Sequence, residues 1–352
     1  MEKILIVNAV QFGYFTDTYY HALALKPYYD VTFLCYDQNK PKFDVQGIKV
    51  IYVQNKSKIL RRLNFYKTVI HESRDYNLMT VSYFKSAFII GLLSKPKLII
   101  LNIFTGNLSE NNWLRTFHNL IIYFNCYFFD RITVLSKNLS DLLRLPSDKT
   151  FIVPVGAVTI DESQKKYDRI SLLYLGTLSK RKIELTVEGF KLFCDKYCGE
   201  IQCHYDIIGN GDYKTENIIK QYITENGLQN FVKYLGRVPQ SELPTYFNNA
   251  TIGVCFVPQT PYYDCQPPTK LFEYAFSGLI NIATSTKENK RFITSNNGVL
   301  CEDNSESFFL ALEKIYRSLH NYNEQKIKAS LSEYHWEQII IEKLLPVLKI
   351  GN

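Results

Sequence analysis

Short apolar runs alternate with amphipathic stretches along almost the whole sequence, and this alternation limits the fold more than any other feature. Strands alternating with helices are typical of a parallel sheet covered by helices on both faces. The sequence therefore predicts two tandem α/β domains, each a doubly wound parallel sheet. The predicted strands of the first domain are 3–8, 31–36, 49–53, 78–81, 97–103 and 131–135, and those of the second are 171–175, 203–208, 232–235, 252–256 and 279–283.

The segment 146–168 interrupts this alternation. It holds a short apolar piece at 151–155 and then a charged run, and we interpret it as the connection between the two domains. We expect an N-terminal domain at 1–160, a C-terminal domain at 161–331 and a final crossover helix at 332–352. The last helix is expected to pack back on the N-terminal domain with one apolar face, made of Trp336, Ile339, Ile340, Leu344 and Val347.

Composition excludes several classes of protein. With 46% hydrophobic and 21% charged residues, the chain of 352 residues is not disordered. No apolar stretch reaches 18 uninterrupted residues, and no signal peptide is visible, so we expect a cytoplasmic protein. The net charge of +7 is mild, and the basic residues form no recognisable nucleic-acid module. Neither C-x-x-C nor D-x-D occurs, so no metal site is expected.

Loops that follow the predicted strands are the candidate ligand-binding segments, because ligands lie beyond the carboxyl ends of parallel strands. The loop 176–182, GTLSKRK, combines Gly176 with three cations and precedes a helix, which suits phosphate oxygens. A solvated basic turn is an equally good interpretation. Gly13 and Gly209 lie in two other such loops, where an ordinary turn is the alternative to close approach of a ligand.

A further candidate lies in the segment 266–284. Thr269 is predicted to cap a helix over 270–277 that Gly278 ends. Glu273 lies one turn into this helix, where its carboxylate could accept both hydroxyls of a ribose. The alternative is a solvated glutamate on a helix surface.

Seven segments in order resemble one known family. They are FDRITVLSKNLSDLL (129–143), FIVPVGA (151–157), LLYLGTLSKRK (172–182), YDIIGNGD (205–212), GLQNFVKYLGRVPQSELPTYFNNATIGV (227–254), PTKLFEYAFSGL (268–279) and NNGVLCEDNSESFFLAL (296–312). Together they resemble the retaining GT-B glycosyltransferases of glycosyltransferase family four. The resemblance implies two Rossmann-like domains with an interdomain cleft that holds a nucleotide sugar.

The resemblance also implies roles for single residues. Lys182 matches the lysine that binds the diphosphate and supports catalysis. Thr177 stands where the family has an arginine, so Arg181 is expected to replace that charge. Glu273 matches the glutamate that holds the ribose. Further donor-binding residues implied by position are Gly13, Gly176, Gly209, Arg237 and Val238.

Two departures from the family pattern concern the donor site. The family's first glutamate falls at Cys265, and Asp264 beside it is the candidate substitute. The phosphate-binding turn is here Pro267-Pro268, which lacks N–H groups, so Thr269 and Lys270 are expected to compensate. On the acceptor side the resemblance points only to the strand end 100–106, with Asn102, Phe104 and Thr105.

The implied reaction moves a sugar from a UDP- or GDP-linked donor, with retention and without metal or cofactor, to a hydroxyl of a glycan or lipid-linked glycan. Synthesis of a bacterial surface polysaccharide is the expected context. A sugar-nucleotide epimerase and a GT-B scaffold without transferase activity remain alternatives. The aromatic segment 111–129 is either a core helix or an interfacial helix that would bring the enzyme to the inner face of a membrane.

Overall fold

The computed structural model describes residues 1–54, 57–107, 111–266 and 268–350. The chain forms two compact units. The first comprises Met1–Gly156 and Trp336–Asn352, and the second comprises Ala157–His335. Each unit is described here by itself.

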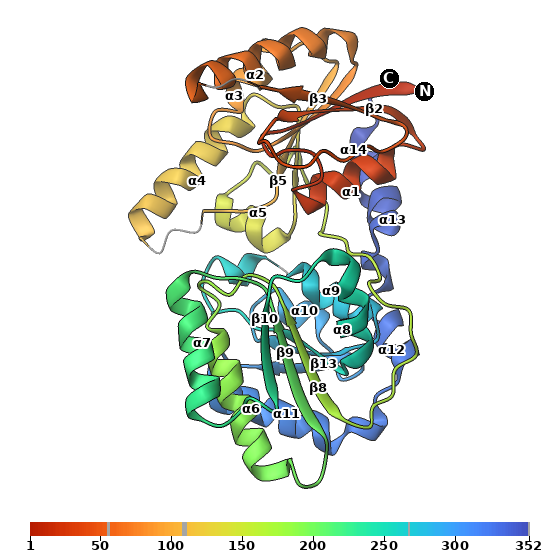
Figure 1. The fold of residues 1–352 in the computed structure, drawn as a ribbon. Coiled ribbons are helices and arrows are strands. Elements are labelled where there is room, and N and C mark those ends of the chain that lie inside the picture. The colour runs from red at the N-terminus through yellow and green to blue at the C-terminus, as the bar shows by residue number, and fades with distance from the viewer. Residues whose placement is uncertain (55–56, 108–110, 267, 351–352) are drawn as a thin grey trace. The chain divides into compact units, whose positions relative to one another are not determined.

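The first unit is built on a parallel sheet of seven strands in the order β3-β2-β1-β4-β5-β6-β7 (Figure 1). The central strands are buried on both faces, which explains why they read as continuous apolar runs in the sequence. The strands are β1 (Glu2–Asn8), β2 (Tyr29–Tyr36), β3 (Ile48–Val53), β4 (Leu78–Ser82), β5 (Leu98–Ile103), β6 (Arg131–Val134) and β7 (Thr150–Ile152).

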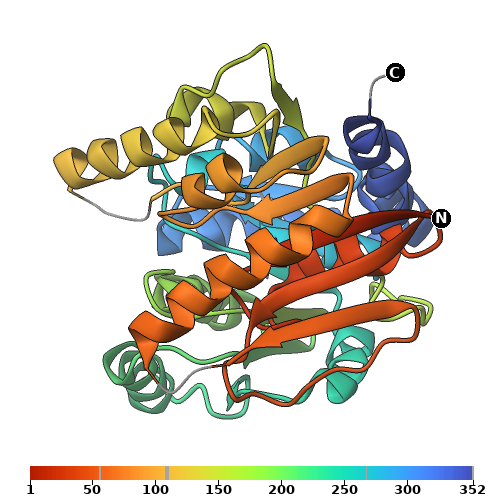
Figure 2. The same cartoon turned by 90° about the horizontal axis from the view of Figure 1, so that it is seen from above.

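Helices cover both faces of this sheet. The winding reverses at β1, and right-handed crossovers on either side of β1 therefore place their helices on opposite faces. Figure 2 shows α2, α3 and α4 lying next to one another on one face, while α1 and the C-terminal helices lie on the other. The helices are α1 (Thr16–Leu25), α2 (Lys58–Glu72), α3 (Phe88–Leu93), α4 (Asn112–Cys126) and α5 (Lys137–Leu143).

The C-terminal segment packs on the first unit, as expected from the sequence. Trp336 stacks on Tyr20 of α1, and Arg131 of β6 donates a hydrogen bond of 2.6 Å to the carbonyl oxygen of Val347. The segment is not the single helix that the apolar spacing predicts. It consists of α13 (Trp336–Ile339), a π-helical stretch (Ile340–Leu344) and α14 (Leu345–Leu348). Pro346 has no N–H to donate to the preceding turn, which accounts for the change of helix type.

The second unit repeats the architecture with six parallel strands in the order β10-β9-β8-β11-β12-β13. The predicted fold class, two doubly wound α/β domains, is therefore confirmed. The strands are β8 (Ile170–Leu175), β9 (Cys203–Ile208), β10 (Val232–Gly236), β11 (Ile252–Cys255), β12 (Ile280–Thr284) and β13 (Gly298–Cys301). The helices are α6 (Ile183–Tyr197), α7 (Tyr213–Glu225), α8 (Leu243–Asn249), α9 (Thr269–Phe276), α10 (Asn289–Phe292), α11 (Ser305–Arg317) and α12 (Glu324–Ala329).

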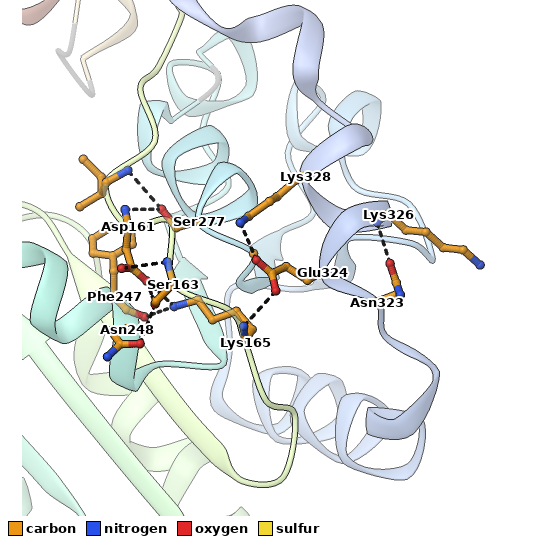
Figure 3. A network of polar contacts seen from close by, with 12 residues as sticks. Asp161, Ser163, Lys165, Phe247, Asn248, Ser277, Asn323, Glu324, Lys326 and Lys328 are labelled. Carbon is orange, nitrogen blue, oxygen red and sulfur yellow. Dashed lines mark hydrogen bonds and ion pairs between the residues drawn. The ribbon is translucent and has the colours of Figure 1, made fainter.

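The charged part of the predicted connection is anchored to the second unit by polar contacts (Figure 3). The buried ammonium of Lys165 donates to the carbonyl oxygen of Phe247 at 2.6 Å and to the Asp161 carboxylate at 2.8 Å. The Ser277 hydroxyl oxygen accepts from the backbone N–H of Asp161, and the Glu324 carboxylate accepts from that of Lys165. Residues 160–165 are therefore an ordered part of the second unit.

Two strands differ from the sequence prediction. The apolar piece 151–155 was expected in the connection, but residues 150–152 form β7, an edge strand that pairs with β6. The strand β13 was not predicted, because its four residues follow a polar stretch and give little periodicity. Among the described helices, none is long and apolar enough to cross a bilayer.

Candidate functional site

The candidate site is assembled at the point of the second sheet where the winding reverses, between β8 and β11. Successive strands lead away from β8 on one side and from β11 on the other. The loops after these two strands therefore diverge, which leaves room for a ligand at their carboxyl ends. Most of the donor-binding residues expected from the sequence lie in the loops and the helix start at this end.

Two of the predicted glycines hold the loops after β8 and β9 against each other. A side-chain carbon built on Gly209 would lie 1.7 Å from the carbonyl oxygen of Gly176. Gly209 also has a φ of 143°, which a residue with a side chain rarely adopts. The Tyr174 hydroxyl donates a hydrogen bond of 2.6 Å to the carbonyl oxygen of Thr177, and this bond ties the start of the basic loop to β8.

The basic loop itself has an uncommon backbone. Lys180 and Lys182 have positive φ angles of 62° and 55°, a conformation that costs a lysine about 1 kcal/mol or more. Lys182 occupies the N-cap position of α6, and its ammonium lies 3.1 Å from the Asp303 carboxylate. The strained loop thus presents the Lys182 side chain, which is 49% exposed, at the N-terminus of a 15-residue helix.

The remaining charges of the site gather around the end of β11. The Arg181 guanidinium lies over the Tyr263 ring, 4.6 Å from its centre. Burial and the charge of Glu273 raise the pKa of the Cys255 thiol, while Lys270 and Arg181 act to lower this pKa. All three charges therefore lie within electrostatic reach of one buried atom at the strand end.

Glu273 is buried, contrary to the solvated alternative. Its side chain is 9% exposed, and its carboxylate accepts a hydrogen bond of 2.5 Å from Lys270, one turn earlier on α9. A buried carboxylate is retained at a low cost only where a cation or hydrogen-bond donors compensate for the lost water. Lys270, which was expected to contact phosphate, is here the partner of Glu273.

The start of α9 differs from the prediction. Thr269 was expected as the N-cap, but the helix begins at Thr269 and Pro268 occupies the cap position without a side-chain hydrogen bond. Pro267 lies outside the described residues, and the N–H groups of Thr269 and Lys270 are at the helix start. The expected end is confirmed, because Gly278 follows the helix with a φ of 74°.

The two residues at the position of the family's first glutamate are engaged within the fold. The Asp264 carboxylate accepts a hydrogen bond of 3.1 Å from the backbone N–H of Lys287. Cys265 is buried, and its thiol donates to the carbonyl oxygen of Pro261 at 3.2 Å. Arg237 is exposed and Val238 half-buried in the loop after β10, which borders β9 at this end of the sheet.

The residues expected in the first unit lie at the carboxyl ends of β1 and β5. Gly13 has a φ of 87°, and the Phe43 ring covers the position where a side chain would stand. Asn102 is buried, and its side-chain oxygen accepts from the Thr133 hydroxyl at 2.7 Å, so this residue joins β5 to β6. Thr105 is exposed.

Phe104 belongs to an aromatic group that the sequence did not reveal. Its ring contacts those of Phe15 and His21, and His21 also meets the edge of Trp336. Burial lowers the pKa of His21 to about 4 and raises the pKa of Asp17, one turn earlier on α1, to about 7. Both groups are therefore held toward their neutral forms.

Asp303 is the main residue of the site that sequence reasoning missed. It follows β13, and its carboxylate accepts from Lys182 and from the backbone N–H of Gln259. The available signal was a pair of carboxylates, Glu302 and Asp303, after the apolar run 299–301, but this run was not recognised as a strand. Tyr263 was also missed, and no sequence pattern marks it. Within the described ranges, no group of three or more His, Cys, Asp or Glu side chains is placed to hold a metal ion.

Comparison with known proteins agrees with this geometry. Residues 169–318, all in the second unit, match the family described as Glycosyl transferases group 1. The whole chain also resembles solved glycosyltransferase structures. Sequence and fold together support a GT-B glycosyltransferase. No curated protein matches the chain significantly.

Three solved GT-B structures illustrate the likeness. Sucrose-phosphate synthase from Thermosynechococcus elongatus superposes with a TM-score of 0.73 at 15% identity, covering 97% of both chains. HepE from Anabaena, in complex with UDP and glucose, gives 0.72 at 13% identity, covering 98% of this chain and 100% of the other. The lipopolysaccharide outer core galactosyltransferase WaaB gives 0.67 at 14% identity, covering 98% and 99%. At such identities the likeness concerns the fold.

Proposed function

We propose that this chain transfers a sugar from a UDP- or GDP-linked donor to a hydroxyl of a glycan or lipid-linked glycan, with retention of the anomeric configuration. The observation that carries the proposal is the set of charges at the end of β8 and β11. Lys182 and Arg181 are presented by a strained loop at a helix N-terminus, and Lys270 lies beside a buried Glu273. Cations together with one buried carboxylate suit a nucleoside diphosphate.

Each group has a role in this proposal. In the reaction the bond between the anomeric carbon and the diphosphate oxygen breaks, a bond to the acceptor oxygen forms, and the acceptor proton leaves with the diphosphate. Negative charge develops on that diphosphate, and Lys182 and Arg181 would stabilise it together with the N–H groups at the start of α6. Glu273 would accept hydrogen bonds from the ribose hydroxyls. These residues supply the chemistry without a metal or separate cofactor.

The comparisons support the donor class and suggest a setting. HepE was solved with UDP and glucose, and WaaB is a galactosyltransferase of the lipopolysaccharide outer core. We infer a similar setting for this chain, the synthesis of a bacterial surface polysaccharide in the cytoplasm or at the inner face of its membrane. Asn102 is buried within the sheet, so Phe104 and Thr105 are the better candidates to border an acceptor.

The first test is a thermal-denaturation screen against UDP, GDP and their sugars. A ligand at 100 times its dissociation constant adds about 2.7 kcal/mol to the free energy of unfolding, which raises the melting temperature by several degrees. We expect a shift with one nucleotide series only. If no nucleotide shifts the transition, the proposed donor site is wrong.

A second experiment tests Glu273 directly. Hydrogen bonds to a charged group contribute about 1.5–3 kcal/mol, so UDP or GDP should bind at least tenfold more tightly than its 2′,3′-dideoxy analogue. The variant Glu273→Gln should lose most of this discrimination. A variant that keeps the full discrimination would remove Glu273 from the ribose site. Proton NMR of the product, read from the anomeric coupling, tests retention.

A binding subunit without turnover is the second candidate, and the state of Cys265 and Asp264 favours it. A glutamate that binds the donor sugar must present its carboxylate to the ligand. Here the side chains of Cys265 and Asp264 are both hydrogen-bonded to backbone groups of the protein instead. Measuring the release of nucleotide from the donor distinguishes the two functions. An active transferase releases nucleotide from its donor, at least by slow hydrolysis, whereas a binding subunit binds the donor and leaves it intact.

A further inference from the structure

Helix α4 carries an apolar stripe on its outer face. Five exposed large side chains of the helix and the residue that follows it recur at intervals of four and three residues, so they form a single line along the helix. The first of them, Trp113, is 72% exposed. A helix that faces water normally carries polar residues on this side. The stripe consists of Trp113, Phe117, Leu120, Phe124 and Tyr127. The sixth exposed large side chain is Leu114.

The opposite face of α4 fixes the direction of this stripe. Ile122, Asn125 and Cys126 are buried against the first unit. The side-chain oxygen of Asn125 accepts a hydrogen bond of 2.7 Å from the backbone N–H of Phe88, and its amide donates to the carbonyl oxygen of Ile121. Because a buried polar side chain is satisfied only in this orientation, the aromatic stripe must point outward. The core-helix interpretation of segment 111–129 is therefore wrong.

The two neighbouring helices also carry exposed apolar side chains. Figure 2 shows α2, α3 and α4 on the same face of the sheet, and α3 contacts both of the others. Eleven of the 21 large apolar side chains that are exposed in the described chain belong to these helices and the residue that follows α4. On α2 and α3 they are Ile59, Leu60, Leu63, Leu92 and Leu93.

The same helices, together with the residues that flank α3, concentrate the positive charge of the protein. The segments 58–72, 84–97 and 111–127 contain eight Lys and Arg residues and one acidic residue, Glu72. Their formal charge of +7 equals that of the whole chain, so the rest of the sequence is balanced. Lys85, Lys95 and Lys97 are exposed in the segments that flank the two ends of α3.

We propose that the face formed by α2, α3 and α4 docks on the surface of an anionic lipid bilayer. Aromatic and leucine side chains flanked by cations fit the boundary between headgroups and acyl chains, where Trp and Tyr are enriched. The charge complementarity selects anionic lipid, since basic residues near such a surface each add to the affinity. A nucleic acid would match the cations but leave the aromatic stripe unpartnered. This inference does not depend on the donor site and would deepen the proposed function by bringing the enzyme to a lipid-linked acceptor.

The experiment measures sedimentation of the full chain with vesicles of phosphatidylcholine alone or mixed with phosphatidylglycerol. We expect binding to the anionic vesicles only. The chain has two tryptophans, and Trp336 is 4% exposed, so a blue shift of the emission on binding would come from Trp113. The variant Trp113→Phe should bind the vesicles with almost no such shift.

Surface variants distinguish vesicle binding by this face from nonspecific binding of the protein to vesicles. The pair Trp113→Ser and Phe117→Ser should weaken vesicle binding by about tenfold or more. Lys95→Gln with Lys97→Gln should weaken it by about 25-fold, roughly fivefold for each charge. The matched control is Tyr213→Ser with Leu310→Ser in the second unit. These side chains are 82% and 52% exposed, close to the 72% of Trp113 and the 49% of Phe117, and binding should not change.

Several outcomes would overturn the proposal. Absence of vesicle binding, equal binding to neutral vesicles, or equal loss in the control pair would each do so. If light scattering shows a dimer that Trp113→Ser with Phe117→Ser dissociates, and vesicles are not bound, the occupant of this face is a second copy instead. Nucleotide binding measured on the same samples keeps this result separate from the donor proposal, because either one can fail alone.

Discussion

The ammonium of Lys182 lies 3.1 Å from the carboxylate of Asp303, although 121 positions separate the two residues in the sequence. The pair joins the loop after β8 to the loop after β13, and both loops lie at the same end of the second sheet. Lys182 therefore already has an anionic partner at the place where we propose that a diphosphate binds. The first two predictions test the two members of this pair.

Replacing Lys182 by alanine should lower kcat by about 10²–10³, because a stabilising charge at a developing anion is lost. The matched control is Lys180→Ala. Lys180 lies in the same loop and shares the positive φ, so both variants impose the same backbone change. We expect the control to retain most of the activity and both variants to melt near the wild-type temperature. Equal losses of kcat in the two variants would contradict a specific role for Lys182.

Replacing Asp303 by asparagine should strengthen binding of the free nucleoside diphosphate. The change removes the carboxylate that competes for the Lys182 ammonium, while an oxygen acceptor for the N–H of Gln259 remains. An exposed pair of this kind contributes up to about 1 kcal/mol, so the Kd should fall by up to about fivefold. Calorimetry at low and high salt measures this. Weaker binding would show that Asp303 positions Lys182 rather than competing for it.

The parts of the fold that could be predicted are those that the local periodicity of apolar residues indicates. Strands such as β1 and β8 are largely buried in a parallel sheet and therefore appear as nearly continuous apolar runs. The edge strand β7 has only three residues, two of them exposed, and the apolar piece 151–155 was too short to predict a strand there. The side chain of Thr269 is typical of an N-cap residue. Pro268 is nevertheless the N-cap, because its fixed φ suits that position.

The candidate site divides in the same way. Glycine and cation patterns in the loop 176–182 are local and could be seen in the sequence. The pairing of Lys182 with Asp303 depends on strand order, which brings β8 and β13 into one sheet, and no local pattern records it. The partner of Glu273 was also missed, although Lys270 lies three positions earlier on the same predicted helix, a spacing that favours an ion pair.

The third prediction concerns Lys165, which anchors residues 160–165 to the second unit (Figure 3). Its side chain is 1% exposed, and burial acts to lower its pKa, against the charge of Asp161. Replacement by methionine removes the cation that pairs with the Asp161 carboxylate and one of the donors to the carbonyl oxygen of Phe247. We expect a loss of about 3–5 kcal/mol in the free energy of unfolding, the usual cost of breaking a buried ion pair.

Urea denaturation, followed by circular dichroism, checks this prediction. The matched control is Lys166→Met, because Lys166 is the exposed neighbour and its replacement should change stability by no more than about 0.5 kcal/mol. The double variant Lys165→Met with Asp161→Asn should recover part of the loss, since no unpaired charge is then left in place. A loss for Lys165→Met as small as that of the control would show that the anchor contributes nothing.

The fourth prediction concerns the pH dependence of stability and rests on Asp17 and His21 of α1. The pKa of Asp17 rises from 3.8 in the unfolded chain to about 7, and that of His21 falls from 6.5 to about 4. Between about pH 4 and 6.5 the folded state holds one proton more at Asp17 and one fewer at His21 than the unfolded state. The Asp17 contribution to stability therefore falls as the pH rises, while the His21 contribution grows, and the two slopes oppose each other.

Single variants should reveal the two slopes. Relative to the wild type, Asp17→Asn should gain about 1.4 kcal/mol of stability for each pH unit between pH 4 and 7. His21→Phe, which keeps an aromatic ring beside Phe104 and Trp336, should lose the same amount per unit between pH 4 and 6.5. Urea denaturation across this range measures both differences, and the titration of all other groups cancels in them. A difference that does not vary with pH would show that the side chain in question titrates alike in the folded and unfolded chains.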